Sequence, residues 1–201
     1  MSLDLSDTKG RILQAAIDIV GLKGEVTIKE ITEKAGVNIA AINYHFGNKN
    51  NLLREVENYY TDLLYKMQQE ILIDDKMSPS EKLIRWAKGL VDFMFMYPAL
   101  LALIVNIVSE DKNYNPAIIK NIYLNNELQV SVKNIISEST GIYEEKLLNY
   151  KYMQIFSGIL GPVVSKAVYS IYGQGKGMMD IENSDELDEY IKVLVTSILK
   201  G

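Results

Sequence analysis

Hydrophobic residues along this chain recur at spacings of three and four, which is the period of a helix buried on one side. Over residues 8–22 the stripe consists of Ile12, Ala16, Ile19 and Val20. No stretch shows the strict alternation of a half-buried strand followed by a hairpin turn. The pattern therefore predicts a protein built of helices.

Two short helices are predicted next. One covers residues 27–35, where Thr27 and Glu30 have the spacing of a capping box. The other covers residues 38–45 and begins with Asn38 as its N-cap. Longer helices are expected over 49–72, 80–97, 99–110, 117–139, 144–172 and 185–200, separated by segments with turn-forming residues.

The composition narrows the possible functions. The chain has 201 residues, of which 48% are hydrophobic and 23% charged, as in folded globular proteins. It has no cysteine and one histidine, which excludes disulfides, thiolate metal sites and multi-histidine sites within one chain. A catalytic site would depend on carboxylates, Lys, Ser and Tyr, and no paired-carboxylate motif stands out. We therefore expect neither an enzyme nor a bound cofactor.

Hydropathy and the N-terminal segment bear on location. The longest apolar run, residues 93–105, has 13 residues and contains Pro98, whereas a membrane span needs about 20. No secretory signal pattern precedes the first predicted helix. We therefore expect a cytoplasmic protein without a membrane partner.

Charge is distributed unevenly along the chain. The net charge is −5, but residues 1–54 carry seven Lys or Arg against six Asp or Glu. The acidic excess lies in the remainder of the chain. This asymmetry is compatible with a DNA-binding N-terminal part, although many enzymes show it by chance.

The segment 38–46 has a composition that fits a helix lying against DNA. Ile42 and Phe46, one turn apart, share a face that can pack inward. The opposite face carries Ile39, Ala40, Asn43 and Tyr44. Asn can pair with adenine in the major groove, and small apolar side chains can contact thymine methyl groups. The segment has no acidic residue that would repel phosphates, so with the preceding helix it predicts a helix-turn-helix.

Flanking groups can bind the DNA backbone. Lys49 and the N–H groups that open the helix over 49–72 form an anion-binding end, and Thr27 offers a similar one. Tyr44 and His45 can each donate a hydrogen bond to a phosphate. Core packing of His45 against a backbone carbonyl, and partial burial of Tyr44 at a hinge, remain open as alternatives.

The same stretch of sequence resembles a known family. "TIKEITEKAGVNIAAINYHFGNKNNLL", preceded by "RILQAAIDIVGLKG", is similar to the N-terminal domain of the TetR family of bacterial transcription regulators. The resemblance implies an all-helical, usually dimeric protein with a ligand-responsive C-terminal part. It implies base contacts from Ile39, Ala40 and Asn43, and phosphate contacts from Thr27, Asn38, Tyr44, His45 and Lys49.

Two domains follow from this organisation. Residues 1–47 are expected to form a three-helix helix-turn-helix domain, and residues 48–201 a helical domain for ligand binding and dimerisation. The last two helices carry small residues and an apolar stripe that suit a helix partner, so they are expected to pair in a homodimer. An intrachain bundle is the alternative. The expected interface residues are Gly158, Gly161, Ser165, Leu187, Ile191, Leu194 and Ile198.

A small-molecule effector is implied by the family resemblance. Candidate pocket residues are aromatic or flexible side chains in apolar segments, and for each of them ordinary core packing is the favoured alternative. They are Phe93, Met96, Tyr97, Tyr123, Met153 and Phe156. Such a lining favours an apolar or aromatic effector.

Taken together, these features predict an all-α, dimeric regulator that binds double-stranded DNA at a palindromic operator, and the resemblance favours a ligand-responsive repressor. The alternative is a helical interaction module that does not bind DNA. Buried Tyr44 and Lys49 side chains, or binding that depends only weakly on salt, would favour that alternative.

Overall fold

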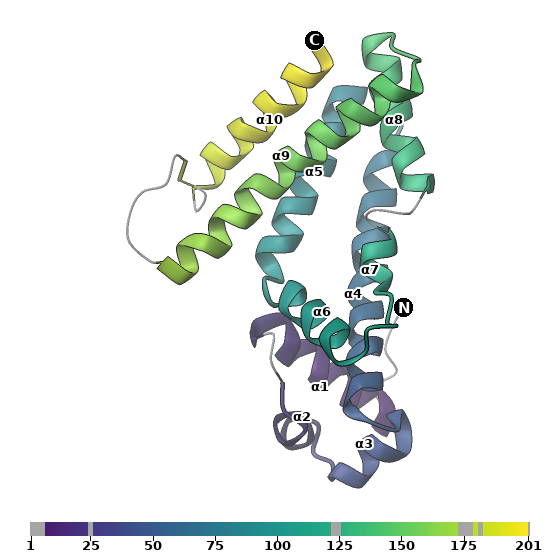
Figure 1. Cartoon of the computed structure of the whole chain (residues 1–201), viewed down its shortest axis with the longest axis vertical. Coiled ribbons are helices and arrows are strands. Elements are labelled where there is room, and N and C mark those ends of the chain that lie inside the picture. Colours follow the sequence, from purple (N-terminus) through teal and green to yellow (C-terminus); the bar gives the residue numbers. More distant parts are fainter. Residues whose placement is uncertain (1–6, 24–25, 122–125, 173–178, 181–182, 201) are drawn as a thin grey trace. The chain divides into compact units, whose positions relative to one another are not determined.

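The computed structural model of the chain describes residues 7–23, 26–121, 126–172, 179–180 and 183–200. These residues are helical apart from short connections, and no strand occurs among them (Figure 1). The helices are α1 (Thr8–Lys23), α2 (Ile28–Ala35), α3 (Ile39–Phe46), α4 (Lys49–Leu72), α5 (Pro79–Met96), α6 (Ala99–Glu110), α7 (Ala117–Ile119), α8 (Asn126–Thr140), α9 (Glu145–Tyr172) and α10 (Ser184–Lys200).

The all-helical prediction is confirmed, and one predicted element is wrong. Helices α4 and α6 have the bounds expected from the sequence. The single helix predicted over 117–139 is instead two helices, since α7 ends at Ile119 and α8 begins at Asn126. Asn121 and Asn126, at this junction, are weak helix formers, and the two helices belong to different compact units.

The chain divides into two compact units. Residues 1–65 and 96–124 form the first, called the head unit here, and residues 66–95 and 125–201 form the second, the body unit. The head unit extends well beyond the predicted segment 1–47, because it includes most of α4 together with α6 and α7. The division of functions between residues 1–47 and 48–201 stays a prediction.

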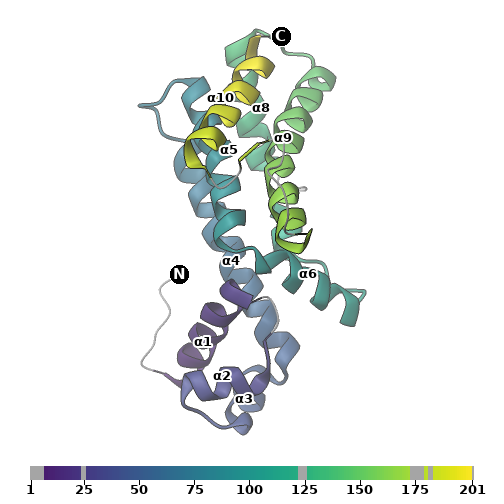
Figure 2. The same ribbon diagram turned by 90° about the vertical axis from the view of Figure 1, so that its left-hand side faces the viewer.

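The core of the head unit lies where α1, α2 and α3 meet (Figures 1 and 2). From α1, Ile12, Ala16 and Val20 are fully buried, and so are Ile31 of α2 and Ile42 of α3. Helix α6 also packs against α1. The apolar stripe read from the first helix thus builds this core, which in turn holds α3 in place.

The body unit has its own core. Helix α9 packs against α8 and α10, and α10 also packs against α8. On α5 the buried Trp86 donates a hydrogen bond from Nε1 to Gln68 Oε1 at 3.0 Å, and its ring lies 6.4 Å from that of Tyr152. Within the described parts of the chain, no helix combines the length and hydrophobicity needed to cross a membrane.

Candidate nucleic-acid interface

Helix α2 has the local signals predicted for its two ends. Thr27 is its N-cap, and the capping box with Glu30 is complete. Gly36 closes the helix in the left-handed conformation with φ of 66°, which side-chain-bearing residues adopt only at a cost. The Val37 N–H then donates to the Thr32 carbonyl at 3.0 Å, which leads the chain directly into α3.

Helix α3 begins and ends at polar or glycine residues. The Asn38 side chain accepts a hydrogen bond from the Ala41 N–H at 3.0 Å, so the predicted N-cap is confirmed. Gly47, with φ of 78°, ends the helix, and its N–H donates to the Asn43 carbonyl at 2.9 Å. Both ends are therefore set by local hydrogen bonds.

The two faces of α3 differ as predicted. Ile42 and Phe46 are buried in the head unit. Ile39, Ala40, Asn43 and Tyr44 are exposed on the other face, with exposed fractions of 54% for Ile39 and 85% for Tyr44. The exposed face thus combines one amide, one phenol and two small or branched apolar groups, with no acidic side chain. This set matches what base edges and thymine methyl groups present in a major groove.

The groups at the end of α3 and the start of α4 supply donors. The Tyr44 and His45 rings meet edge to face with centroids 5.0 Å apart, and His45 and Lys49 are half-buried. Asn48 caps α4, because its Oδ1 accepts from the Asn51 N–H at 2.9 Å. This cap occupies one of the N–H groups at the predicted anion-binding end of α4.

Thr27 is placed less favourably for a phosphate contact than expected. It is exposed, but its hydroxyl donates to Glu30 Oε2 at 2.8 Å, and the Thr27 N–H donates to the same oxygen at 2.9 Å. A phosphate would have to replace the Glu30 carboxylate, whose charge repels it. The contact predicted for Thr27 therefore stays a prediction that requires this exchange.

Sequence reasoning missed a buried polar cluster in the head unit. Glu57 on α4 is fully buried and is hydrogen-bonded by Tyr114 and Ile118. Burial, followed by the hydrogen bond to Glu57 and its negative charge, raises the pKa of the Tyr114 hydroxyl. A signal existed, because Glu57 occupies a core position in the apolar stripe that includes Leu53, Val56, Tyr60 and Leu64.

The predicted ligand-pocket residues are divided between the two compact units. Phe93 and Phe156 are buried in the body unit, whereas Met153 is exposed there. Met96 is exposed in the head unit, and the Tyr97 ring lies 4.7 Å from that of Tyr60. Tyr123 lies outside the described residues. A common effector site for these residues therefore stays a prediction.

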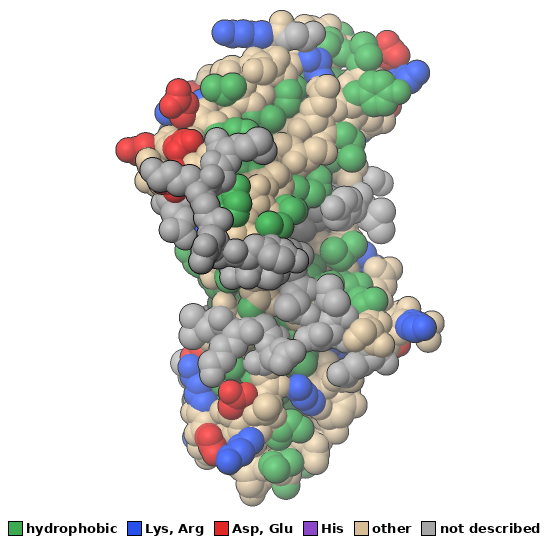
Figure 3. All heavy atoms as spheres, turned by 60° about the vertical axis from the view of Figure 1, so that its left-hand side comes forward, with side chains coloured by type: hydrophobic (Ala, Val, Ile, Leu, Met, Phe, Trp, Pro, Cys, Tyr) green, Lys and Arg blue, Asp and Glu red, His purple; other side chains and the backbone are tan. Residues whose placement is uncertain are grey.

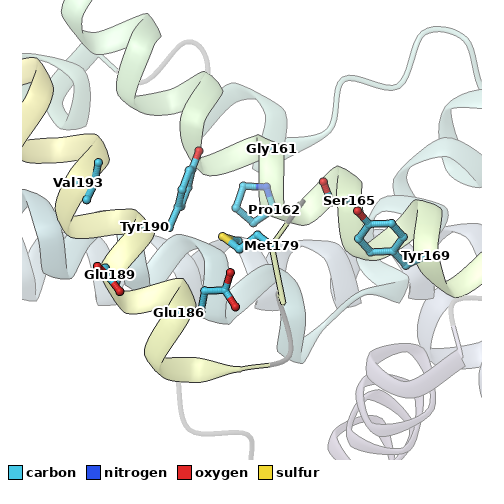
Figure 4. A pocket seen from close by; sticks show the side chains of 9 residues that line it. All are labelled: Gly161, Pro162, Ser165, Tyr169, Met179, Glu186, Glu189, Tyr190 and Val193. Atoms are coloured by element: carbon cyan, nitrogen blue, oxygen red, sulfur yellow. The ribbon is translucent and has the colours of Figure 1, made fainter. Parts of the chain in front are cut away.

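Helices α9 and α10 leave two hollows on the surface of the body unit. In the first, of about 560 Å³, Pro162 and Tyr169 of α9 lie on one side and Glu186 and Tyr190 of α10 on the other, with Met179 between them (Figure 4). The second, of about 850 Å³, is lined by Lys151, Met153, Gln154, Ser157, Leu194, Ser197 and Ile198. Among the exposed large side chains of the two helices are Val164, Val168 and Val193. Figure 3 shows that hydrophobic side chains lie at the surface on one side of the chain.

The predicted dimer-interface residues fall into two groups. Leu187, Ile191 and Ile198 are buried within the single chain, so the stripe of α10 packs inside its own unit. Leu194 contacts α9 at Gly158, where an added Cβ would lie 2.5 Å from its methyl groups. Gly161 is exposed and Ser165 is half-buried, and both line the first hollow. Leu194 and Ile198 line the second hollow, so predicted interface residues border both hollows, and their contact with another chain stays a prediction.

Comparisons with known proteins agree with this fold. Residues 12–56 match the family model described as bacterial regulatory proteins, tetR family. A comparison with curated protein sequences finds no match.

Solved structures extend the likeness along the chain. PfmR, a TetR family transcriptional regulator from Thermus thermophilus, has 18% identity and a TM-score of 0.62, covering 97% of each chain. A transcriptional regulator from Rhodococcus sp. Rha1 has 16% identity and a TM-score of 0.61, also covering 97% of each chain. A TetR transcriptional regulator from Streptomyces coelicolor has 14% identity and a TM-score of 0.55 over 96% of this chain and 97% of that one. Residues 12–56 thus match the model of the tetR family of bacterial regulatory proteins, and the chain shares its overall fold with solved TetR family transcriptional regulators.

Proposed function

We propose that the protein is a dimeric, ligand-responsive repressor that reads a palindromic operator with α3. The observation that carries the proposal is the exposed, acid-free face of α3, which is held outward because Ile42 and Phe46 are buried behind it. Two copies of such a short helix reach two half-sites about 34–36 Å apart or a multiple of this.

Each exposed residue of α3 is given a role by its chemistry. Asn43 presents an amide that can make two hydrogen bonds to adenine, and Ile39 and Ala40 contact thymine methyl groups. Tyr44, His45 and Lys49 donate to phosphates and set the register of the helix. The oxygen of Asn38 is used by the cap of α3, so this residue offers DNA its NH₂ group.

A second copy of the chain is the proposed partner of the α9–α10 face. Val164 and Val193 are more than half exposed there, and the two hollows leave room for side chains of another helix pair. Helix pairs of this kind bury their apolar side chains in the grooves of a partner. Leu187, Ile191 and Ile198 support this face from behind by fixing α10 within its own unit.

Regulation is proposed to follow from a shift between two states. An effector that binds the body unit of one state better lowers the population of the other, and its effect is limited to that difference in affinity. An apolar or aromatic effector fits the composition of the body unit. Equal operator affinities with and without an effector that occupies this unit would contradict the mechanism.

The test of DNA reading is a selection of genomic DNA fragments by the purified protein. The wild-type chain is compared with Asn43→Ala, Tyr44→Ala and Tyr143→Ala, where Tyr143 is a matched control because it is 80% exposed and lies in the body unit. We expect the wild type and Tyr143→Ala to enrich one palindrome, Asn43→Ala to change its sequence and Tyr44→Ala to lose it.

The alternative function, a protein-interaction module, predicts a different result. A folded wild-type dimer would then enrich no DNA, and any partner binding would depend little on salt. The exposure of Tyr44 favours the DNA reader over this alternative, because an exposed aromatic residue beside the reading face is available to a phosphate.

A further inference from the structure

Glu57 of α4 carries a buried carboxylate that takes no part in the DNA contacts proposed for α3. Its Oε2 accepts a hydrogen bond from the Tyr114 hydroxyl at 2.7 Å. Its Oε1 accepts from the Ile118 N–H at 2.7 Å and from the Thr61 hydroxyl at 3.3 Å. A buried charge carries a large desolvation cost and is tolerated only where partners of this kind satisfy it.

Arg54 lies one turn before Glu57 on α4. It binds Asp111, which precedes Tyr114 and Ile118 along the chain. Its Nη2 lies 2.5 Å from Asp111 Oδ2, and its guanidinium carbon lies 4.7 Å from the centroid of the Tyr114 ring. The Arg54 Nε atom is buried without a hydrogen-bond partner among the described residues. The guanidinium is therefore held between an ion pair and an aromatic face.

Residues 111–118, called the strap here, run from the end of α6 into α7 and are bound to α4 at both ends by these contacts. Helix α6 packs against α1, and the Tyr60 hydroxyl of α4 donates to the Ile17 carbonyl of α1 at 2.9 Å. The contacts thus form a closed ring from α4 through the strap and α6 to α1 and back to α4. The whole ring belongs to the head unit.

We propose that the strap fixes the direction of α4 within the DNA-reading head, with Glu57 and Arg54 as positioning residues. The inference rests on the proposed function. Because α4 continues along the chain into the body unit, its direction in the head sets how α3 is presented to DNA. With the strap bound, α6 and α7 move with α1–α3 as one part. Without it, α3 keeps its base-reading face, but the two heads of a dimer lose their defined separation.

The test compares two DNA probes, one with the complete operator found by the genomic selection and one with a single half-site. Glu57→Gln replaces one acceptor oxygen by a donor group, and Tyr114→Phe removes only a hydroxyl while keeping the ring beside Arg54. We expect both variants to lose about tenfold in affinity for the complete operator and less than about twofold for the half-site. Tyr143→Phe, which removes an exposed hydroxyl, is expected to bind both probes as the wild type does.

Hydrogen exchange measured by NMR provides a readout that needs no DNA. The Ile118 amide should exchange about tenfold faster in Glu57→Gln, because its hydrogen bond to the carboxylate is weakened, whereas amides of α9 should be unchanged. If Glu57→Gln does not fold, Tyr114→Phe decides the question by both measurements.

Equal losses on the two probes would overturn the positioning role, and so would unchanged affinity in a variant whose Ile118 amide exchanges faster. A wild-type chain that binds no DNA would overturn the proposed function instead. In that case the exchange rate of Ile118 would still show whether Glu57 holds the strap, so the two failures are distinguishable.

Discussion

Asn38 is the residue that fixes where α3 begins, through the hydrogen bond between its Oδ1 and the Ala41 N–H. Asn38→Ala should lower the free energy of unfolding by about 1 kcal/mol, since the cap is lost. Asn38→Ser should restore most of the stability, because a serine hydroxyl also caps. Urea unfolding measures both, and a stable Asn38→Ala variant would show that the cap contributes little. If the amide NH₂ binds a phosphate, operator affinity should stay reduced in Asn38→Ser.

Substitutions of Lys49 and Asn43 should distinguish contacts to phosphates from contacts to bases. Lys49→Ala should weaken binding to all sequences alike and lower the slope of log affinity against log salt by about 1, because one phosphate contact is lost. Asn43→Ala should leave the slope unchanged and cost about 1–3 kcal/mol on the preferred base alone. Titrations at several salt concentrations measure both effects. An altered slope for Asn43→Ala would mean that this residue contacts the backbone instead.

The residues that could be predicted from the sequence are those whose role is local. The caps Thr27 and Asn38 act on N–H groups three residues away, so their spacing in the sequence is sufficient. Glu57 could not be predicted in the same way, because its partners Tyr114 and Ile118 lie 57 and 61 residues away along the chain. Only the fold shows that hydrogen bonds from these two residues compensate for the burial of its carboxylate in an apolar stripe.

Two glycines of α9 should respond oppositely to alanine. At Gly158 an added Cβ meets the Leu194 methyl groups at 2.5 Å, so Gly158→Ala should be destabilising, with overpacking of about 1–3 kcal/mol exceeding the gain in helix propensity. At Gly161 an added Cβ would lie 3.8 Å from the Tyr190 hydroxyl oxygen, which is an ordinary contact, so Gly161→Ala should raise the stability of the single chain by about 1 kcal/mol.

Thermal and urea unfolding at low protein concentration test this pair, and Leu194→Ala should reduce the penalty at Gly158 in a double-mutant cycle. If Gly161→Ala instead weakens dimerisation, a partner helix approaches α9 closely at this position. A destabilised monomer for both variants would contradict the packing described for Gly161.

The amphipathic pattern of α10 identified a helix but not its partner. Leu187, Ile191 and Ile198 form a stripe that suits any apolar neighbour, and in the structure that neighbour belongs to the same chain. Hydrophobic periodicity reports that a face is buried and contains no information about which chain buries it. The exposed residues Val164 and Val193, which break the simple pattern, are the better indication of an external partner.

At the scale of the whole molecule, the division of the chain could not be read from the sequence. The apparent boundary after residue 47 follows the end of a motif, whereas the compact head unit also takes in residues 96–124. These residues are distant in sequence, and they join the unit through buried groups such as Glu57 and through the packing of α6 on α1. Motifs are contiguous by nature, whereas compact units depend on contacts between distant segments.

The proposed dimer should depend on the exposed apolar side chains of α9 and α10, and it should bind a palindrome better than a single chain does. Val164→Glu and Val193→Glu place a charge at exposed positions on α9 and α10, so each chain should stay folded while the apolar contact with a second copy is lost. Val130→Glu, on α8 and similarly exposed at 47%, is the control. Analytical ultracentrifugation should show monomers for the first two variants and dimers for the control.

Affinity for the operator should fall in the two monomeric variants and stay unchanged in the control. The monomeric variants should lose at least about a hundredfold in affinity for the complete palindrome, because the second head no longer binds as part of the same molecule, while a single half-site is bound as before. Dimers that persist in both Val164→Glu and Val193→Glu would mean that a different face joins the two chains. In that case the apolar side chains on α9 and α10 would require another partner.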